Sequence, residues 1–189
     1  MKPALKIVIG IPGGSTPVDK RSIRDSASHA GAHDIYMIYE PMASALGIGL
    51  DVEAPNGNMV IDIGGGTTDL SPEDGPEDFH VIGRNMITAH PAEAFISYKE
   101  IALCIDKTIV KIESEIIKVL QRIEPEVYSN IVQNGIWLAG GGSLLRGIAR
   151  RFTDKVNIPF RVAEDPLKAV ARGTCLALKG TDRYQFFER

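Results

Sequence analysis

Two glycine-rich turns carry the residue types best suited to binding a phosphorylated ligand. The first follows an apolar run over residues 59–63, and its candidate residues are Asp62, Gly64, Gly65, Gly66, Thr67 and Thr68. Because glycine has no Cβ atom, its backbone can approach a phosphate closely and direct several N–H groups at the oxygens. The hydroxyls of Thr67 and Thr68 can add hydrogen bonds to a phosphate or to an attacking water. This turn therefore favours phosphate binding over the plain tight turn that glycines at a strand end also form.

The carboxylate before these glycines is suited to a metal ion. Asp62 is the last but one residue of the apolar run, at the edge where the turn begins. Carboxylate oxygens are preferred ligands of Mg²⁺, which usually keeps several of its waters when it binds to a protein. We expect Asp62 to hold a hydrated Mg²⁺ through water.

The second turn follows an apolar run over residues 135–139, and its candidate residues are Gly140, Gly141, Gly142, Ser143 and Leu144. A helix is predicted to begin near Ser143, and its N-terminus would offer free N–H groups to the phosphate or sugar of a nucleotide. The turn matches neither the dinucleotide pattern G-x-G-x-x-G nor a P-loop, since no Gly-Lys-Ser/Thr follows it. One such turn is weak evidence, whereas two that each end a buried strand are much stronger.

The elements that must position these turns follow from apolar patterns and breakers. Strands are predicted over residues 5–11, 35–39, 59–63, 135–139 and 160–163, and helices over 17–30, 42–48, 97–120, 143 onward and 167–178. Strands and helices alternate over the first 63 residues, which is typical of one parallel sheet with crossover helices. Residues 79–82 and 86–89 flank Gly83, Arg84 and Asn85 as a hairpin.

Two further features concern the core. In the helix over residues 97–120, isoleucines at helical spacing predict one core-facing side. Trp137 is expected in the sheet core, whereas the aromatic tail at Tyr184, Phe186 and Phe187 could dock on the core or serve a partner.

Composition limits the class of protein. The chain has 189 residues and a net charge of −3, which gives no electrostatic reason to expect nucleic acid as a partner. No signal peptide and no apolar run long enough to span a membrane are evident. Cys104 and Cys175 lie in apolar helical patterns, so we expect buried free thiols in a reducing cytoplasm.

The paired turns resemble the phosphate and adenosine motifs of the actin, Hsp70 and sugar-kinase superfamily. Within it the chain resembles the MreB family of bacterial actins. The similar stretches are residues 9–12, 21–27, 40–45, 59–69, 140–147, 163–167 and 170–173. They cover most of the chain in the order that the family has.

The resemblance implies an ATP-binding, Mg²⁺-dependent protein that forms filaments with copies of itself and acts with the cell-wall elongation machinery that determines rod shape. By position, Gly64 to Thr67 resemble the second phosphate loop, Gly140 to Leu144 the adenosine loop, and Asp62 the aspartate that faces the metal's water shell. Asp19 stands where the family has a glutamate that orients the attacking water, although its carboxylate is one methylene shorter. An acidic residue in the first turn of a helix is the equally weighted alternative.

The resemblance also has two interruptions. We expect residues 1–50 to be a remnant of the first actin-like half, without its first phosphate loop. Residues 51–189 are then the second half without its small subdomain, which the family inserts after Leu70. The family's membrane-binding elements are not found either. Because half of the cleft would be missing, we expect weak nucleotide binding and hydrolysis near background.

These observations predict an incomplete α/β fold of the ribonuclease-H-like, actin type, with a mostly parallel sheet and helices on both faces. Two other functions stay open from the sequence alone. One is a phosphotransferase of the sugar-kinase type, for which Asp19 is the best available carboxylate. The other is a folded fragment without the family's activity.

Overall fold

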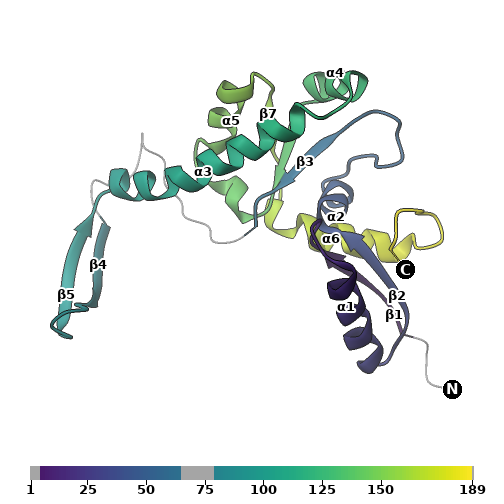
Figure 1. Cartoon of the computed structure of the whole chain (residues 1–189), viewed down its shortest axis with the longest axis horizontal. Coiled ribbons are helices and arrows are strands. Elements are labelled where there is room, and N and C mark those ends of the chain that lie inside the picture. The colour runs from purple at the N-terminus through teal and green to yellow at the C-terminus, as the bar shows by residue number, and fades with distance from the viewer. Residues whose placement is uncertain (1–4, 65–78, 189) are drawn as a thin grey trace.

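The structure, a computed structural model, describes residues 5–64 and 79–188 (Figure 1). Its strands are β1 (Leu5–Ile11), β2 (Ala32–Tyr39), β3 (Met59–Asp62), β4 (Phe79–Arg84), β5 (Pro91–Ile96), β6 (Ile136–Ala139) and β7 (Phe160–Val162). Its helices are α1 (Pro17–His29), α2 (Glu40–Gly47), α3 (Tyr98–Leu120), α4 (Pro125–Asn134), α5 (Ile148–Val156) and α6 (Ala169–Lys179). Short 3₁₀ turns, η1 (Gly141–Leu144) and η2 (Pro166–Lys168), follow β6 and β7.

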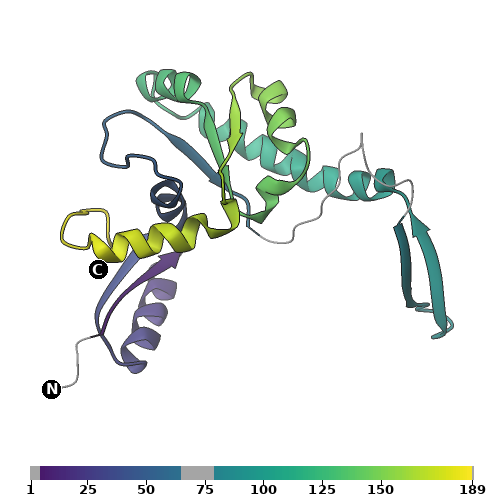
Figure 2. The same cartoon turned by 180° about the vertical axis from the view of Figure 1, so that it is seen from behind.

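The fold is α/β with mostly parallel strands, as the sequence predicts, but the strands form two parallel sheets. One has the order β1-β2 and the other β3-β6-β7. The prediction that the first three strands share one sheet was wrong. A crossover helix normally packs back onto its own sheet, whereas α2 packs mainly on α6 (Figure 2). The chain therefore leaves the first sheet at α2, and β3 starts the second.

The contact between α2 and α6 is unusually close, and it joins the two sheets. A Cβ atom placed on Gly173 would lie 1.7 Å from the carbonyl oxygen of Ala43. A Cβ atom on Gly47 would lie 1.9 Å from the carbonyl oxygen of Ala169. Only glycine permits this approach of two backbones, so these two positions set the spacing of the helices.

The first sheet is completed by the end of the chain. Helix α1 begins with a capping box, in which Thr16 accepts from the N–H of Asp19 and the Asp19 carboxylate accepts from the N–H of Thr16. The C-terminal aromatic residues dock on the core rather than projecting outward. The centroids of the Phe187 and Tyr36 rings lie 5.3 Å apart. Beyond them, Glu188 exchanges two backbone hydrogen bonds with Met37 of β2.

The second sheet packs against the C-terminal half of α3. Ile116 and Leu120 of the predicted stripe are buried with Leu138 and Phe152, whereas Ile101 and Ile105 towards the start of the helix are only half-buried. Trp137 is also half-buried and lies beneath the Arg161 guanidinium instead of in the core. Successive side chains of a strand point to opposite faces of the sheet. The buried residues on either side of Trp137 face the core, so Trp137 itself lies on the other face.

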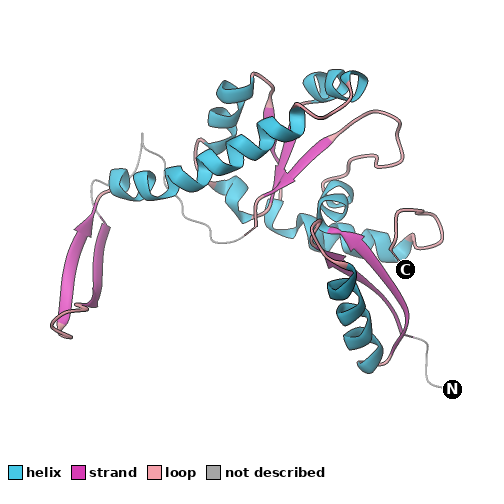
Figure 3. Cartoon of the chain, in the orientation of Figure 1, coloured by secondary structure: helices cyan, strands magenta, loops and turns pink. Residues whose placement is uncertain are grey.

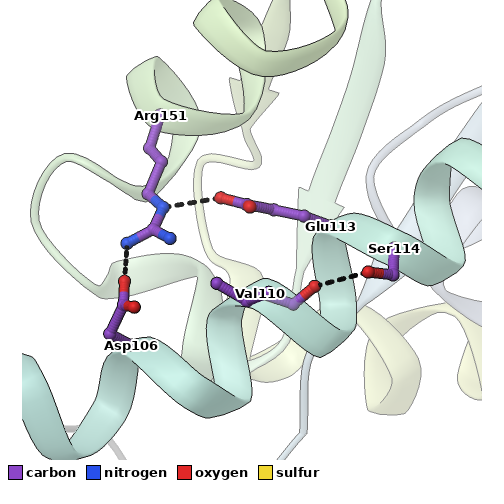
Figure 4. A network of polar contacts seen from close by, with 5 residues as sticks. All are labelled: Asp106, Val110, Glu113, Ser114 and Arg151. Carbon is purple, nitrogen blue, oxygen red and sulfur yellow. Dashed lines mark hydrogen bonds and ion pairs between the residues drawn. The ribbon is translucent and has the colours of Figure 1, made fainter.

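An ion-pair network fixes α5 against α3 (Figure 4). Arg151 on α5 donates to Glu113 and to Asp106 of α3, each across 2.6 Å. The bond to Glu113, which is buried, is the main cause of a raised pKa for Arg151. Because α5 follows the second glycine turn, this network also holds that turn in place.

The β4–β5 hairpin projects away from both sheets, beyond the N-terminal end of α3 (Figure 3). Its first strand is close to the prediction, but the second lies at Pro91–Ile96 rather than at residues 86–89. Asn85 explains the difference, since its side chain accepts from the N–H groups of Ile87 and Thr88 and its own N–H bonds the carbonyl of His90. The turn therefore occupies the residues that were expected to form a strand.

Two smaller differences concern a helix and the thiols. Helix α4 was not predicted, although Pro125 in its first turn and Gly135 at its end are ordinary boundary signals. Cys104 and Cys175 are exposed rather than buried, because each lies on the solvent side of its amphipathic helix. No described helix is long and apolar enough to cross a membrane.

Candidate functional site

The two strands that lead into the predicted glycine turns end side by side at one edge of the second sheet. β3 and β6 are parallel neighbours, with Asp62 opposite Ala139 in the register. The carboxyl ends of parallel strands meet at the same edge of a sheet, where ligands of open α/β folds bind. The ladder continues one step further, since the Ile63 N–H donates to the Ala139 carbonyl across 2.9 Å. The chain therefore enters the two turns, at Gly64 and at Gly140, from neighbouring positions at the ends of β3 and β6.

The second turn is in direct contact with the residues that lead into the first. The Gly142 N–H donates to the Ile63 carbonyl across 2.8 Å. A Cβ atom on Gly140 would lie 2.4 Å from a carboxylate oxygen of Asp62, and one on Gly142 would lie 2.3 Å from the Ile63 side chain. The backbone at Gly140 has a φ of 78°, which side chains disfavour. Glycine at these two positions is thus required by the contact of the second turn with Asp62 and Ile63, whatever ligand binds there.

The second turn forms a 3₁₀ helix before the α-helix begins. Helix α5 begins at Ile148, so the prediction of a helix N-terminus near Ser143 was wrong by five residues. The N–H groups of Gly140, Gly142 and Ser143 donate within the protein, to Pro166, Ile63 and Gly140 respectively. These three N–H groups already donate hydrogen bonds within the protein. A ligand would therefore contact mainly the backbone surface of the glycines.

The side chains of this turn differ in exposure. Ser143 is buried and donates its hydroxyl to the Gly140 carbonyl across 2.6 Å. Leu144 is partly exposed. The Ser143 hydroxyl thus stabilises the turn from inside, and the Leu144 side chain is the one that a ligand could contact.

Asp62 is held by a residue that sequence analysis did not single out. Its carboxylate accepts a hydrogen bond of 2.6 Å from the hydroxyl of Ser44, which is buried in α2. Ser44 comes from the helix that packs on α6, so the α2–α6 contact also positions this carboxylate. Nothing in the spacing of Ser44 and Asp62 predicts their contact, since only the tertiary fold brings α2 to β3.

The other predicted site residues lie elsewhere or outside the described part of the chain. Asp19 is exposed on α1, and no contact within the described residues joins it to Asp62 or to either turn. Hydrogen bonds from the Thr16 hydroxyl and N–H hold the pKa of the Asp19 carboxyl below its ordinary value. The structure thus gives this carboxylate a capping role. Predictions for Gly65, Gly66, Thr67 and Thr68 fall on residues that the structure does not describe.

A cavity of about 740 Å³ opens on the other side of Asp62. Its walls come from α2, the segment over residues 50–58, β3 and the C-terminal half of α3. Most lining side chains are apolar, and the charged ones are Asp51, Asp62, Lys111 and Glu115. Among the described residues, no group of three or more acidic, His or Cys side chains is arranged to hold a metal ion. A metal at Asp62 would therefore depend on water and on a ligand for its other contacts.

Comparison with known proteins identifies this arrangement. A family described as MreB/Mbl protein matches residues 1–72 and 70–185, in two parts that meet where the sequence predicts an interruption. The Cell shape-determining protein MreB of Escherichia coli is 31% identical over 97% of this chain and 68% of its own length. The structure is similar to MreB 5 of Spiroplasma citri bound to AMPPNP, with a TM-score of 0.86 and 25% identity over 94% of this chain and 69% of that one.

A more distant likeness supports the fold alone. A MamK double helical filament gives a TM-score of 0.75 at 17% identity, over 96% of this chain and 70% of that one. The matches agree on one architecture, in which two parallel sheets are joined by closely packed helices. The chain belongs to the MreB/Mbl family of actin-like, cell shape-determining proteins.

Proposed function

We propose that this chain binds an adenine nucleotide at the paired glycine turns and associates with copies of itself in the cytoplasm. The observation that carries the proposal is the contact of the second glycine turn with Asp62 and Ile63, which lead into the first, at the carboxyl edge of β3 and β6. The Spiroplasma relative with 25% identity is bound to AMPPNP, a nucleotide triphosphate analogue. We further propose that this association forms filaments and that the chain acts with the cell-wall elongation machinery, with its membership of the family as the support.

In this proposal the two turns have different tasks. Gly64 and the residues after it receive the phosphates, and Gly140, Gly141, Gly142 and Leu144 lie against the adenosine, while Ser143 supports the turn from inside. The three consecutive glycines of the second turn carry no side chains, which suits close approach of a purine or ribose. The nucleotide contacts mainly this surface, so binding is expected to be weaker than in a closed cleft.

The proposed role of Asp62 is to orient the water shell of Mg²⁺ beside the phosphates. The Ser44 hydroxyl occupies one of its oxygens, which fixes the direction of the carboxylate. Mg²⁺ supplies charge neutralisation at the phosphates when it is bound. Asp19 and Thr68 remain candidates for orienting the attacking water, and Asp19 would first have to release its capping hydrogen bonds.

Calorimetric titration with Mg-ATP tests nucleotide binding. We expect saturable heat at millimolar nucleotide, and a loss of at least about tenfold in affinity in Gly142→Ala, because the added methyl pushes the second turn away from Ile63. Gly83→Ala is the matched control, since a Cβ atom there meets nothing within 4 Å. Absence of heat with the folded wild-type chain would exclude binding, and equal affinity in both variants would exclude this surface.

Self-association is tested separately by sedimentation with and without Mg-ATP. Material that pellets, or a rise in mean mass with concentration, supports it. A chain that stays monomeric at millimolar concentration in both conditions would exclude it.

A further inference from the structure

The β4–β5 hairpin exposes more large apolar side chains than a free surface element usually does. Met86 and Ile87 in its turn are each 94% exposed, and Ile82 and Phe95 on its strands are each 70% exposed. Within the described part of the chain, β4 and β5 pair only with each other. A two-stranded hairpin alone is marginally stable in water, and an apolar patch of this kind marks an interaction site.

A second unmatched surface lies beside β3. This strand is at the edge of the β3-β6-β7 sheet, so its outer backbone groups have no partner strand among the described residues. The cavity of about 740 Å³ opens along the same strand, and it has the size and apolar lining of a binding pocket. An open strand edge beside an apolar cavity is suited to an added β-strand.

The fold keeps these two surfaces apart within one chain. The hairpin is joined to Tyr98 at the start of α3, whereas Lys111 and Val119 of the same helix line the cavity. The fourteen residues of helix from Tyr98 to Lys111 span about 20 Å. The capping box of Ser97 and Glu100 fixes the direction in which the hairpin leaves the helix, and Figure 1 shows it pointing away from both sheets. A second copy of the chain is therefore the natural partner.

Charge agrees with this pairing. Asp51, Asp62 and Glu115 outnumber Lys111 among the charged residues that line the cavity. In the turn of the hairpin, Arg84 is the charged residue and no acidic residue lies between it and His90. The hairpin thus presents a positive, apolar tip to a negative, apolar opening.

We propose that the β4–β5 hairpin of one copy docks in the cavity beside β3 of a second copy. This is the contact through which the chain would associate with copies of itself, so the proposal rests on the self-association proposed above. Because the two surfaces differ, the contact is heterologous, and each bound copy still offers one free hairpin and one free cavity. Such copies assemble head to tail into open chains.

The test uses one variant on each surface, followed by sedimentation velocity without nucleotide. Ile87→Asp charges the hairpin tip, and Val119→Asp charges the cavity wall. Val18→Asp is the control, because Val18 is exposed on α1, outside both surfaces. We expect each surface variant to weaken association by at least about tenfold and the control to leave it unchanged. Circular dichroism checks that every variant is folded.

Mixing the two surface variants gives the most specific result. The Ile87→Asp chain keeps an intact cavity and the Val119→Asp chain keeps an intact hairpin, so an equimolar mixture should form a dimer and nothing longer. A hairpin-to-hairpin contact would instead leave Val119→Asp as associative as the wild type, and that result would overturn the proposal. So would a mixture that stays monomeric while the wild type assembles.

Disulfide trapping provides an independent readout. In a Cys104→Ser, Cys175→Ser background, one chain carries Met86→Cys and the other Val119→Cys. Oxidation should give the mixed dimer, whereas pairing Met86→Cys with Val18→Cys should not. If the wild type assembles and no mixed dimer forms, docking is overturned while self-association stands. A wild type that is monomeric at millimolar concentration overturns both.

Discussion

Gly173→Ala is the substitution for which the structure makes the sharpest prediction. The new methyl group would lie 1.7 Å from the carbonyl oxygen of Ala43 and 2.6 Å from its carbon. Since such atoms repel within about 3.5 Å, helices α2 and α6 would have to separate by roughly 2 Å. The obstacle is backbone, so no side-chain rotation relieves it.

The cost follows from two opposing effects. Overpacking of a core costs about 1–3 kcal/mol and sometimes more, and a backbone clash on a glycine between two helices belongs at the upper end. Alanine stabilises a helix interior by about 1 kcal/mol relative to glycine. We therefore expect a net loss of about 2–3 kcal/mol, which lowers the Tm of a chain of this size by roughly 4–12 °C.

Urea unfolding followed by circular dichroism measures this loss. Cys175→Ala in the same helix is the control and should change the free energy of unfolding by less than about 0.5 kcal/mol, because Cys175 is exposed. Gly47→Ala should cost a similar amount to Gly173→Ala. The double variant should cost less than the sum, because one separation of the helices relieves both clashes. If Gly173→Ala were as stable as the control, the close helix contact would be refuted.

Two further predictions concern other parts of the fold. Arg151→Met should lower the free energy of unfolding by about 2–3 kcal/mol in urea melts, because it leaves the buried Glu113 carboxylate without its ion pair. The Glu188 carboxyl, whose pKa is lowered mainly by its hydrogen bond from Lys20, contributes stability above its unfolded-state pKa. This contribution is lost as pH falls through the lower folded-state pKa, so stability measured between about pH 5 and pH 2 should fall more steeply in the wild type than in Glu188→Gln.

Each of these has its own control. Arg150→Met should have little effect, since Arg150 is exposed and lies 3.9 Å from Asp154. An equal loss in both arginine variants would contradict the role of the buried pair. Lys20→Met should remove the larger part of the pH dependence that Glu188→Gln removes, since the Tyr39 hydroxyl still donates to Glu188. A pH profile unaltered by either substitution would contradict the ion pair.

Local signals in the sequence predicted local structure well. The capping boxes at Thr16 and Ser97 were formed by residues three apart, so the starts of α1 and α3 follow from the sequence alone. The glycine turn after β6 was predicted for the same reason. The hairpin was the exception, because Gly83, which was expected in the turn, lies in β4, and the Asn85 side chain organises the turn between Arg84 and Pro91.

Features that depend on distant parts of the chain could not be predicted in this way. The Ser44–Asp62 hydrogen bond requires α2 to lie against β3, and this placement depends on Gly47 meeting α6 more than a hundred residues later. The division of strands between two sheets has the same origin. Propensity and periodicity report on neighbours along the sequence, whereas these contacts are chosen by tertiary packing.

The strand pairing between Met37 and Glu188 has a consequence for the order of folding. β1, α1 and β2 are neighbours along the sequence, yet within the described part of the chain their core is covered by α6 and by aromatic residues more than a hundred positions later. Contacts between such distant segments form slowly, and unfinished sheets expose apolar surface meanwhile. The β1-β2 sheet should therefore gain its full core late in folding, and until then it is the surface on which an unfinished molecule would aggregate.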